Sequence, residues 1–126
     1  MLRDLKQGMF NFEKLGVWQE AIRFADLIYE VPRKFPEQER FGLTNQMRRA
    51  AVSVSSNLAE GSSRSSRPDF ARFVEIATGS LFEVLSQARI ALNQKFLTSA
   101  IYSRISEAAE KQSRMLSGLR RSLVEH

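Results

Sequence analysis

The residue types that most often carry enzymatic chemistry are scarce in this sequence of 126 residues. It contains no cysteine and a single histidine, His126, which is the last residue. Thiolate chemistry and cysteine metal sites are therefore excluded, and a Ser-His-Asp triad or a histidine metal cluster is not supported. Glu75 and Glu83 lie about two helical turns apart, but two carboxylates alone give little support to a metal site. The sequence predicts no catalytic residue, no cofactor and no bound metal.

Two short motifs could be mistaken for nucleotide or RNA chemistry. The stretch "EGSSRSSR" at residues 60–67 lacks the spacing and the terminal Lys-Ser/Thr of a phosphate-binding loop, and no strand precedes it. The stretch "RSLVEH", Arg121 to His126, formally fits the Arg-four-residues-His signature of helical HEPN ribonucleases. A histidine at a fraying terminus would be poorly positioned, and so short a match arises easily by chance. A ribonuclease is therefore our third hypothesis, behind two non-enzymatic ones.

The basic residues are the next candidates for function. The formal net charge is +5, and 14 of the 19 basic residues are arginine. The planar guanidinium suits phosphate oxygens and protein carboxylates equally well, so charge permits either an RNA or a protein partner. Four-apart pairing of Glu107 with Lys111 and of Glu110 with Arg114 should neutralise part of the C-terminal segment. The candidates that remain for binding an anion or RNA are Arg64, Arg67, Arg104, Arg120 and Arg121.

Four long helical segments must position these residues. Apolar side chains recur at spacings of three and four, and turn residues such as Pro32, Pro36 and Pro68 separate the segments. The pattern predicts helices over about residues 12–31, 37–60, 67–94 and 99–123, after an N-terminal extension of residues 1–11. Connections this short make consecutive helices antiparallel neighbours. We therefore expect one all-α domain, an antiparallel up-down-up-down four-helix bundle.

Several residues have the chemistry of helix ends. Gly61 is suited to a left-handed C-terminal cap for the second helix. Ser66 can cap the third helix, with Pro68 in its first turn, and Thr98 or Ser99 can cap the fourth.

The apolar faces of the first and third helices are wider than a monomeric bundle needs. We expect the core stripe of the first helix to comprise Leu15, Trp18, Ile22, Ala25 and Tyr29. Other apolar residues lie outside the main stripes, and a helix that is apolar nearly all round is normally buried on both sides. The sequence therefore predicts a homo-oligomer, with an interface that includes Val17, Phe24, Ile28, Ile76, Phe82 and Ile90.

The second helix also carries a polar stripe, within "SVSSNLAEG" at residues 53–61. A helical wheel places six polar residues on one arc beside the apolar stripe: Gln46, Arg49, Ser53, Ser56, Asn57 and Glu60. The stripe could be a solvated face, a polar seam against another helix or subunit, or a direct RNA contact. The sequence leaves these three interpretations open.

Three blocks of the chain, "FEKLGVWQEAIRFADLIYEVPRKFP", "GLTNQMRRAAVSVSSNLAEGSSRSS" and "FARFVEIATGSLFEVLSQ", resemble a known family. It comprises the four-helix bundle proteins linked to intervening sequences in bacterial 23S ribosomal RNA, and the resemblance covers about residues 12–123. The resemblance implies that several bundles assemble into a ring, commonly a pentamer. Distant relatives of this family act as accessory proteins of retroelement reverse transcriptases. The matched motif positions, expected to hold the fold and the subunit seam, are Gln46, Arg49, Ser53, Asn57, Glu60, Gly61, Gly79 and Ser80. The chain departs from the family at "NQKFLT", where relatives often have Leu-Gly.

Two functional hypotheses follow. The first is a non-enzymatic, ring-forming scaffold that binds RNA or a nucleoprotein, which arginines clustered on one face would support. The second is a purely protein-binding structural oligomer, in which arginines would be scattered and salt-bridged. No apolar run approaches the roughly 20 residues needed to span a bilayer, and "MLRDLKQGMF" lacks the apolar centre of a signal peptide. We therefore expect a cytoplasmic bacterial protein with no membrane partner.

Overall fold

The computed structural model describes residues 10–125, and four α-helices account for most of that range. They are α1 (Gly16–Glu30), α2 (Leu43–Ser62), α3 (Arg67–Asn93) and α4 (Ser99–Val124). Single turns of 3-10 helix, η2 (Asn11–Lys14), η3 (Val31–Lys34) and η4 (Glu37–Glu39), lie before α1 and between α1 and α2. No strand occurs within the described range, so the predicted all-α fold class is confirmed. Most of the predicted N-terminal extension, residues 1–9, lies outside it.

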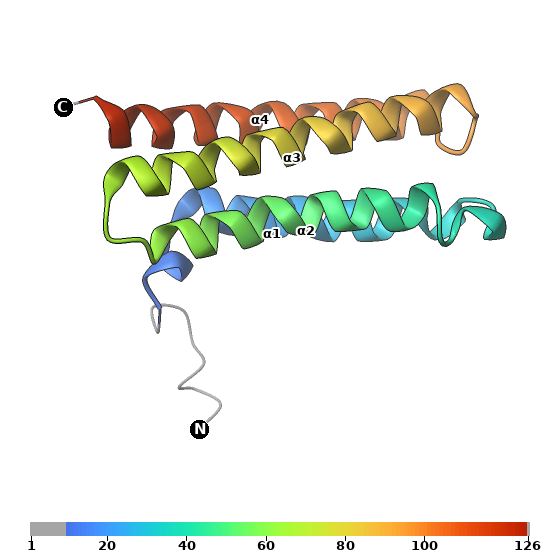
Figure 1. The fold of residues 1–126 in the computed structure, drawn as a ribbon. Coiled ribbons are helices and arrows are strands. Elements are labelled where there is room, and N and C mark those ends of the chain that lie inside the picture. The colour runs from blue at the N-terminus through green and yellow to red at the C-terminus, as the bar shows by residue number, and fades with distance from the viewer. Residues whose placement is uncertain (1–9, 126) are drawn as a thin grey trace.

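The helices run antiparallel in two layers, with α1 and α2 in one layer and α3 and α4 in the other (Figure 1). The connections 31–42 and 94–98 lie together at one end of the bundle, which we call the 31–42 end. The connection 63–66 and the end of α4 lie at the opposite end, which we call the 63–66 end. This is the up-down arrangement expected for short connections.

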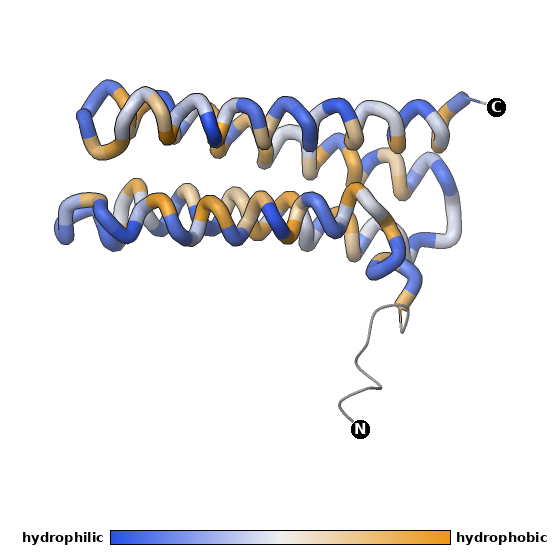
Figure 2. Tube along the Cα trace, turned by 180° about the vertical axis from the view of Figure 1, so that it is seen from behind, coloured by the Kyte–Doolittle hydropathy of each residue, from blue (hydrophilic) through white to orange (hydrophobic). Residues whose placement is uncertain are grey.

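The core is built from the inward faces of all four helices. Hydrophobic and hydrophilic positions alternate along each helix, as amphipathic helices require (Figure 2). The three-and-four spacing of apolar residues also predicts core stripes that run through Leu43, Met47, Ala50, Val54 and Leu58 of the second helix and through Phe70, Val74, Ala77, Leu81, Val84, Ala88 and Leu92 of the third. Their central residues are confirmed as core: Met47, Val54 and Leu58 of α2 and Val74 and Leu81 of α3 are all 0% exposed.

The predicted core stripe of the first helix is wrong in part. Val17, Phe24 and Ile28 are 7%, 2% and 0% exposed and belong to the core, whereas Tyr29 is 45% exposed. These three residues are therefore not available as an oligomer interface, which corrects the prediction for them. Trp18 and others of the predicted stripe pack only at the margin of the core. A helix that is apolar over more than half its circumference offers two possible core faces, and its neighbours decide which one is buried.

Two helices begin later than predicted. Residues 11–14 form a 3-10 turn instead of the first turn of α1, and the Glu13 carboxylate accepts a hydrogen bond from the Phe10 amide at 3.0 Å. After Pro36, residues 37–39 form a separate turn, so α2 begins at Leu43 and not near residue 37. Local side-chain acceptors compete here with the helical pattern: the Glu39 carboxylate accepts from the Leu43 amide at 3.2 Å.

The predicted caps are confirmed at two of three helix ends. The Ser66 hydroxyl accepts from the Asp69 amide at 3.1 Å, and the Thr98 hydroxyl, not Ser99, accepts from the Ile101 amide at 3.2 Å. Gly61 is not a left-handed cap, because it lies inside α2 and is buried. A Cβ atom there would lie 2.6 Å from Cβ of Phe73 on α3. Close packing of the two helices therefore accounts for this glycine.

The connection from α3 to α4 takes a left-handed turn without glycine. Lys95 has φ = 65°. The Lys95 amide donates to the Leu92 carbonyl at 3.0 Å and the Phe96 amide to the Ala91 carbonyl at 2.9 Å, which is the Schellman pattern. Lys95 thus occupies the position at which glycine is most favourable, and the turn holds Phe96 against the bundle.

Candidate functional site

The described residues contain no arrangement suited to metal or acid-base catalysis. No group of three or more His, Cys, Asp or Glu residues could hold a metal ion there. Glu75 is instead paired with Arg120, with 2.6 Å between Oε2 and Nε. His126 lies outside the described range, so the Arg121–His126 motif stays a prediction, while Arg121 donates to the Ser117 hydroxyl at 3.1 Å. No helix in residues 10–125 is long and apolar enough to cross a membrane.

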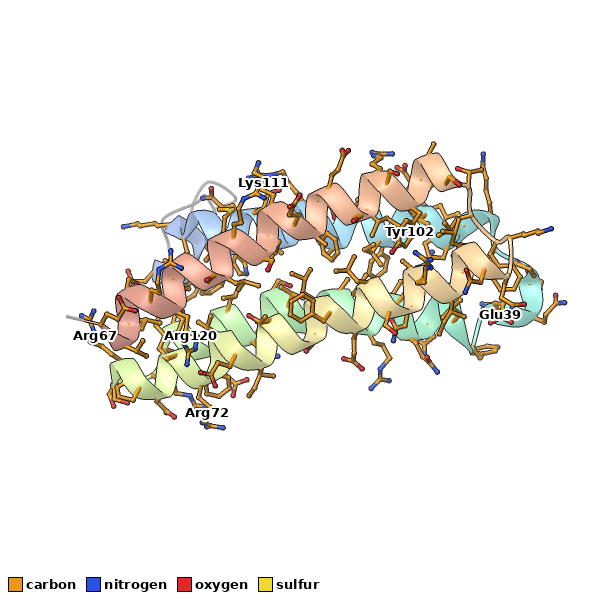
Figure 3. The ribbon with its side chains drawn as sticks, turned by 90° about the horizontal axis from the view of Figure 1, so that it is seen from above. Glu39, Arg67, Arg72, Tyr102, Lys111 and Arg120 are labelled. Atoms are coloured by element: carbon orange, nitrogen blue, oxygen red, sulfur yellow. The ribbon has the colours of Figure 1, made fainter. Side chains whose placement is uncertain are left out.

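The five candidate arginines do not form one patch. Arg67 lies beside the end of α4, where its guanidinium donates to the backbone carbonyls of Ser122 and Leu123. Arg64 and Arg120 belong to this 63–66 end too, and Figure 3 shows Arg67 and Arg120 there. Arg104 borders a cavity at the opposite, 31–42 end of the bundle. The structure therefore separates Arg104 from the rest.

Four of these five arginines already have partners within the chain, since Arg121 donates to the Ser117 hydroxyl. Arg64 pairs with Glu60 at 2.9 Å and lies over the ring of Phe73, 4.7 Å from its centroid. Arg120 pairs with Glu75, and Arg67 binds the last carbonyls of α4, where the helix carries partial negative charge. A phosphate at this end would compete with those partners.

The polar stripe of α2 forms a hydrogen-bonded seam with α3. The hydroxyls of Ser53 and Ser80 are 2.8 Å apart, and the Asn57 amide donates to the Ser53 carbonyl at 2.8 Å and to its hydroxyl at 3.0 Å. These three motif positions therefore meet inside one chain. Glu60 pairs separately with Arg64. The small side chains let the helices approach closely while their polar atoms remain paired.

Two further motif positions lie beside this seam. Gln46 and Arg49 border a shallow cavity of about 270 Å³ between α2 and α3, together with Glu83 and Gln87 of α3. Arg49 is exposed and forms no ion pair with any other residue of the described range. This part of the stripe faces outward, where another molecule could contact it.

The outward face of α3 carries three exposed large apolar side chains. Ile76, Phe82 and Ile90 are 42%, 53% and 49% exposed. Gly79 lies on the same face, and a Cβ atom there would meet nothing within 4 Å. Residues three apart on a helix are surface neighbours, so Gly79 lies between Ile76 and Phe82. We call these four residues the α3 outer face. No contact within the described chain requires a glycine at position 79.

A buried polar cluster joins α1 to α4. Glu20, which is 8% exposed, accepts from Arg23 at 3.0 Å and lies 3.4 Å from the Lys111 ammonium. Lys111 therefore pairs across to α1 and not with Glu107 as predicted, whereas the predicted pair of Glu110 with Arg114 is present at 3.6 Å.

A further buried side chain, Gln112, reinforces this junction. It is 0% exposed and donates to the Val17 carbonyl at 3.1 Å. A buried amide anchored to the backbone of a neighbouring helix fixes the register of the two helices. We interpret this cluster as structural.

Sequence reasoning missed two cavities at the 31–42 end. One has a volume of about 480 Å³ and is bordered by residues of 30–34, 96–98, Ile101 and Arg104. The other, of about 210 Å³, lies beside it, and Arg33 borders both. The signals in the sequence are the basic pair in "VPRKFP" and Arg104, which is one of the predicted anion-binding residues and borders the larger cavity. The segments that close the larger cavity are more than sixty residues apart along the chain, so periodicity could not bring them together.

The comparisons with known proteins agree with the fold. Residues 13–118 match the family described as 23S rRNA-intervening sequence protein. A solved structure of a protein of unknown function from the S23 ribosomal protein family of Bacteroides thetaiotaomicron is 22% identical, with a TM-score of 0.73. The similarity covers 87% of this chain and 99% of that one. At this identity the likeness shows the fold alone. A comparison with curated proteins gives no match.

Proposed function

Because the chain belongs to the family of 23S rRNA-intervening sequence proteins, we propose that it is a non-enzymatic scaffold. In this proposal, copies of the bundle assemble through the α3 outer face into a ring, and the ring binds RNA or a nucleoprotein. The resemblance stated above implies five copies. The observation that carries the proposal is the composition of the α3 outer face.

The α3 outer face supports self-assembly on two grounds. Ile76, Phe82 and Ile90 present apolar surface on one helix, and clustered exposed apolar side chains mark interaction sites more often than isolated ones do. Gly79, placed among them, costs helix stability of roughly 1 kcal/mol relative to alanine and has no packing role within the chain. A helix from a second copy could approach closest at this glycine, as α3 itself approaches α2 at Gly61.

RNA binding is supported by the family description and by the net charge of +5. Several exposed cations, among them Arg33, Lys34, Arg49, Arg104 and Arg121, form no ion pair with other residues of 10–125 and so are available to phosphates. A ring would repeat each of them in every copy, which multiplies weak contacts.

The second candidate is an oligomer that binds only proteins. The observation that favours it is the engagement of Arg64, Arg67 and Arg120 within the chain. Scattered, salt-bridged arginines are what this candidate predicts, so an experiment must separate the two.

The test combines light scattering with RNA binding in a salt series. We expect a defined oligomer whose binding to structured RNA weakens steeply with salt, because bound phosphates release counterions. Arg104→Glu with Arg121→Glu should abolish binding, whereas Arg72→Glu with Arg114→Glu changes the charge equally and should weaken it less. Phe82→Ser should yield folded monomers. An oligomer without RNA binding near physiological salt would select the protein-binding candidate, and a wild-type monomer would refute assembly.

A further inference from the structure

The larger cavity at the 31–42 end has the size and lining of a ligand site. Its volume of about 480 Å³ lies within the range of about 300–1,000 Å³ typical of small-molecule pockets. The end of α1 with η3 forms one wall, and the α3–α4 connection with the first two turns of α4 forms the other. These connections lie side by side at the end of the bundle where Figure 3 labels Glu39.

The floor of this cavity is apolar and held in place by its surroundings. Val31, Phe96, Leu97 and Ile101 all pack against the core. The Phe96 ring contacts the ring of buried Phe35, with 5.6 Å between centroids, and the Schellman turn holds the Phe96 backbone. A floor that is already ordered binds a ligand without the entropic cost of ordering it.

The rim is cationic. Arg33, Lys34 and Arg104 border the cavity, and none of them pairs with a carboxylate of the described range. Glu30 is the one acidic residue among the described lining residues. The rim therefore carries a net positive charge, and the nearby N-terminus of α4 adds to the positive potential.

We propose that this cavity binds a small amphipathic anion. Its carboxylate or phosphate head pairs with Arg33, Lys34 and Arg104, and its acyl or aryl body lies on Val31, Phe96 and Ile101. An inorganic anion would leave the apolar floor in contact with water. A sugar or nucleoside would need hydrogen-bond partners that the floor lacks, since buried polar groups require them. A neutral apolar molecule would not use the charge of the rim.

The first test is calorimetric titration of the full chain with four probes. Octanoate and monomeric octyl phosphate should bind, while octanol and inorganic phosphate should bind at least about tenfold more weakly, since each lacks one half of the recognised chemistry. Equal binding of octanol, or equal binding of inorganic phosphate, would overturn the proposal. No binding of octanoate or octyl phosphate would overturn it as well.

Charge variants then locate the site. Arg104→Gln should weaken octyl phosphate binding by about tenfold, because a charge-assisted hydrogen bond is lost. Glu30→Gln should tighten it several-fold, because the repelling carboxylate is removed. Arg114→Gln, an exposed α4 arginine paired with Glu110, is the matched control and should leave binding unchanged. If Arg104→Gln and Arg114→Gln behave alike, the anion binds elsewhere and the proposal is wrong.

A last arm distinguishes a soluble ligand from a lipid. Binding to phosphatidylglycerol vesicles that octyl phosphate displaces and Arg104→Gln weakens would identify a lipid as the source of the anion. Binding of the free probes without vesicle binding would identify a soluble acid. Vesicle binding that octyl phosphate does not displace, with no binding of the free probe, would refute the pocket. These outcomes do not depend on RNA binding, so this proposal and the scaffold proposal can fail separately.

Discussion

Two glycines inside helices have opposite surroundings. Gly61 of α2 is buried against α3, and a Cβ atom there would lie 2.6 Å from Cβ of Phe73 and 2.9 Å from Cδ1 of Phe70. Gly79 of α3 is exposed, and the same added atom would meet nothing. Both are motif positions of the resembled family, and neither has the positive φ that would demand glycine.

The difference between the two positions separates a glycine that contacts within the chain require from one that they do not. At Gly61 the α2–α3 contact requires a residue without a side chain. At Gly79 no contact within the described chain requires one, although glycine weakens the helix. The first glycine therefore belongs to the fold, and we assign the second to the proposed assembly.

The largest expected effect is at the buried glycine. Gly61→Ala should lower the free energy of unfolding by about 1–2 kcal/mol, because overpacking costs more than the gain in helix propensity returns. Denaturant titration in the Phe82→Ser background, which the scaffold proposal expects to be monomeric, measures this without a contribution from assembly. An increase in stability would show that α2 and α3 adjust easily and would remove the contrast between the two glycines.

At the exposed glycine, Gly79, we expect substitution by alanine to change the free energy of unfolding in the opposite direction. In the same monomeric background, Gly79→Ala should raise the free energy of unfolding by about 0.5–1 kcal/mol, since alanine favours the helix and meets open space. In the wild-type background, Gly79→Leu should weaken the oligomer measured by light scattering, because a bulky side chain prevents close approach. An unchanged oligomer would remove Gly79 from the interface.

The smallest expected change in the free energy of unfolding is at Lys95, where the left-handed backbone favours glycine but the chain has lysine. Lys95→Gly should raise the free energy of unfolding by about 0.5 kcal/mol, because relief of the left-handed strain exceeds the added entropy of the unfolded chain. Gln94→Gly is the matched control and should lower it, because Gln94 has φ = −80° and gains nothing from glycine. If both variants are destabilised alike, the Schellman turn does not strain Lys95.

The buried face of a helix is easier to predict from the sequence when its apolar residues are confined to one side. On α2 the buried stripe is predictable because a single face is continuously apolar, as Met47 and Val54 show, and on α3 the main stripe through Leu81 is predictable although further apolar residues lie outside it. On α1 two apolar faces compete, and periodicity could not select Phe24 over Tyr29. Gly61 was misassigned because a glycine near a helix end suits a left-handed cap and a close helix contact equally well.

The candidate site was less predictable than the fold. Arg64 and Arg120 were identified as cations, but their pairing with Glu60 and Glu75 depends on side-chain direction and, for Arg120, on the neighbouring helix. Arg33 and Lys34 were missed because they become a rim only when the α3–α4 connection lies beside them.

The sequence by itself determined four amphipathic helices, their antiparallel order and two of their caps, because these depend on spacing, short connections and side chains within one helical turn. Only the tertiary structure decided which face of α1 is buried, why Gly61 is required, how Lys111 reaches Glu20 and where the cavity forms. Each of these depends on atoms from segments distant in sequence, and a periodic pattern on one helix carries no information about the neighbour that will cover it.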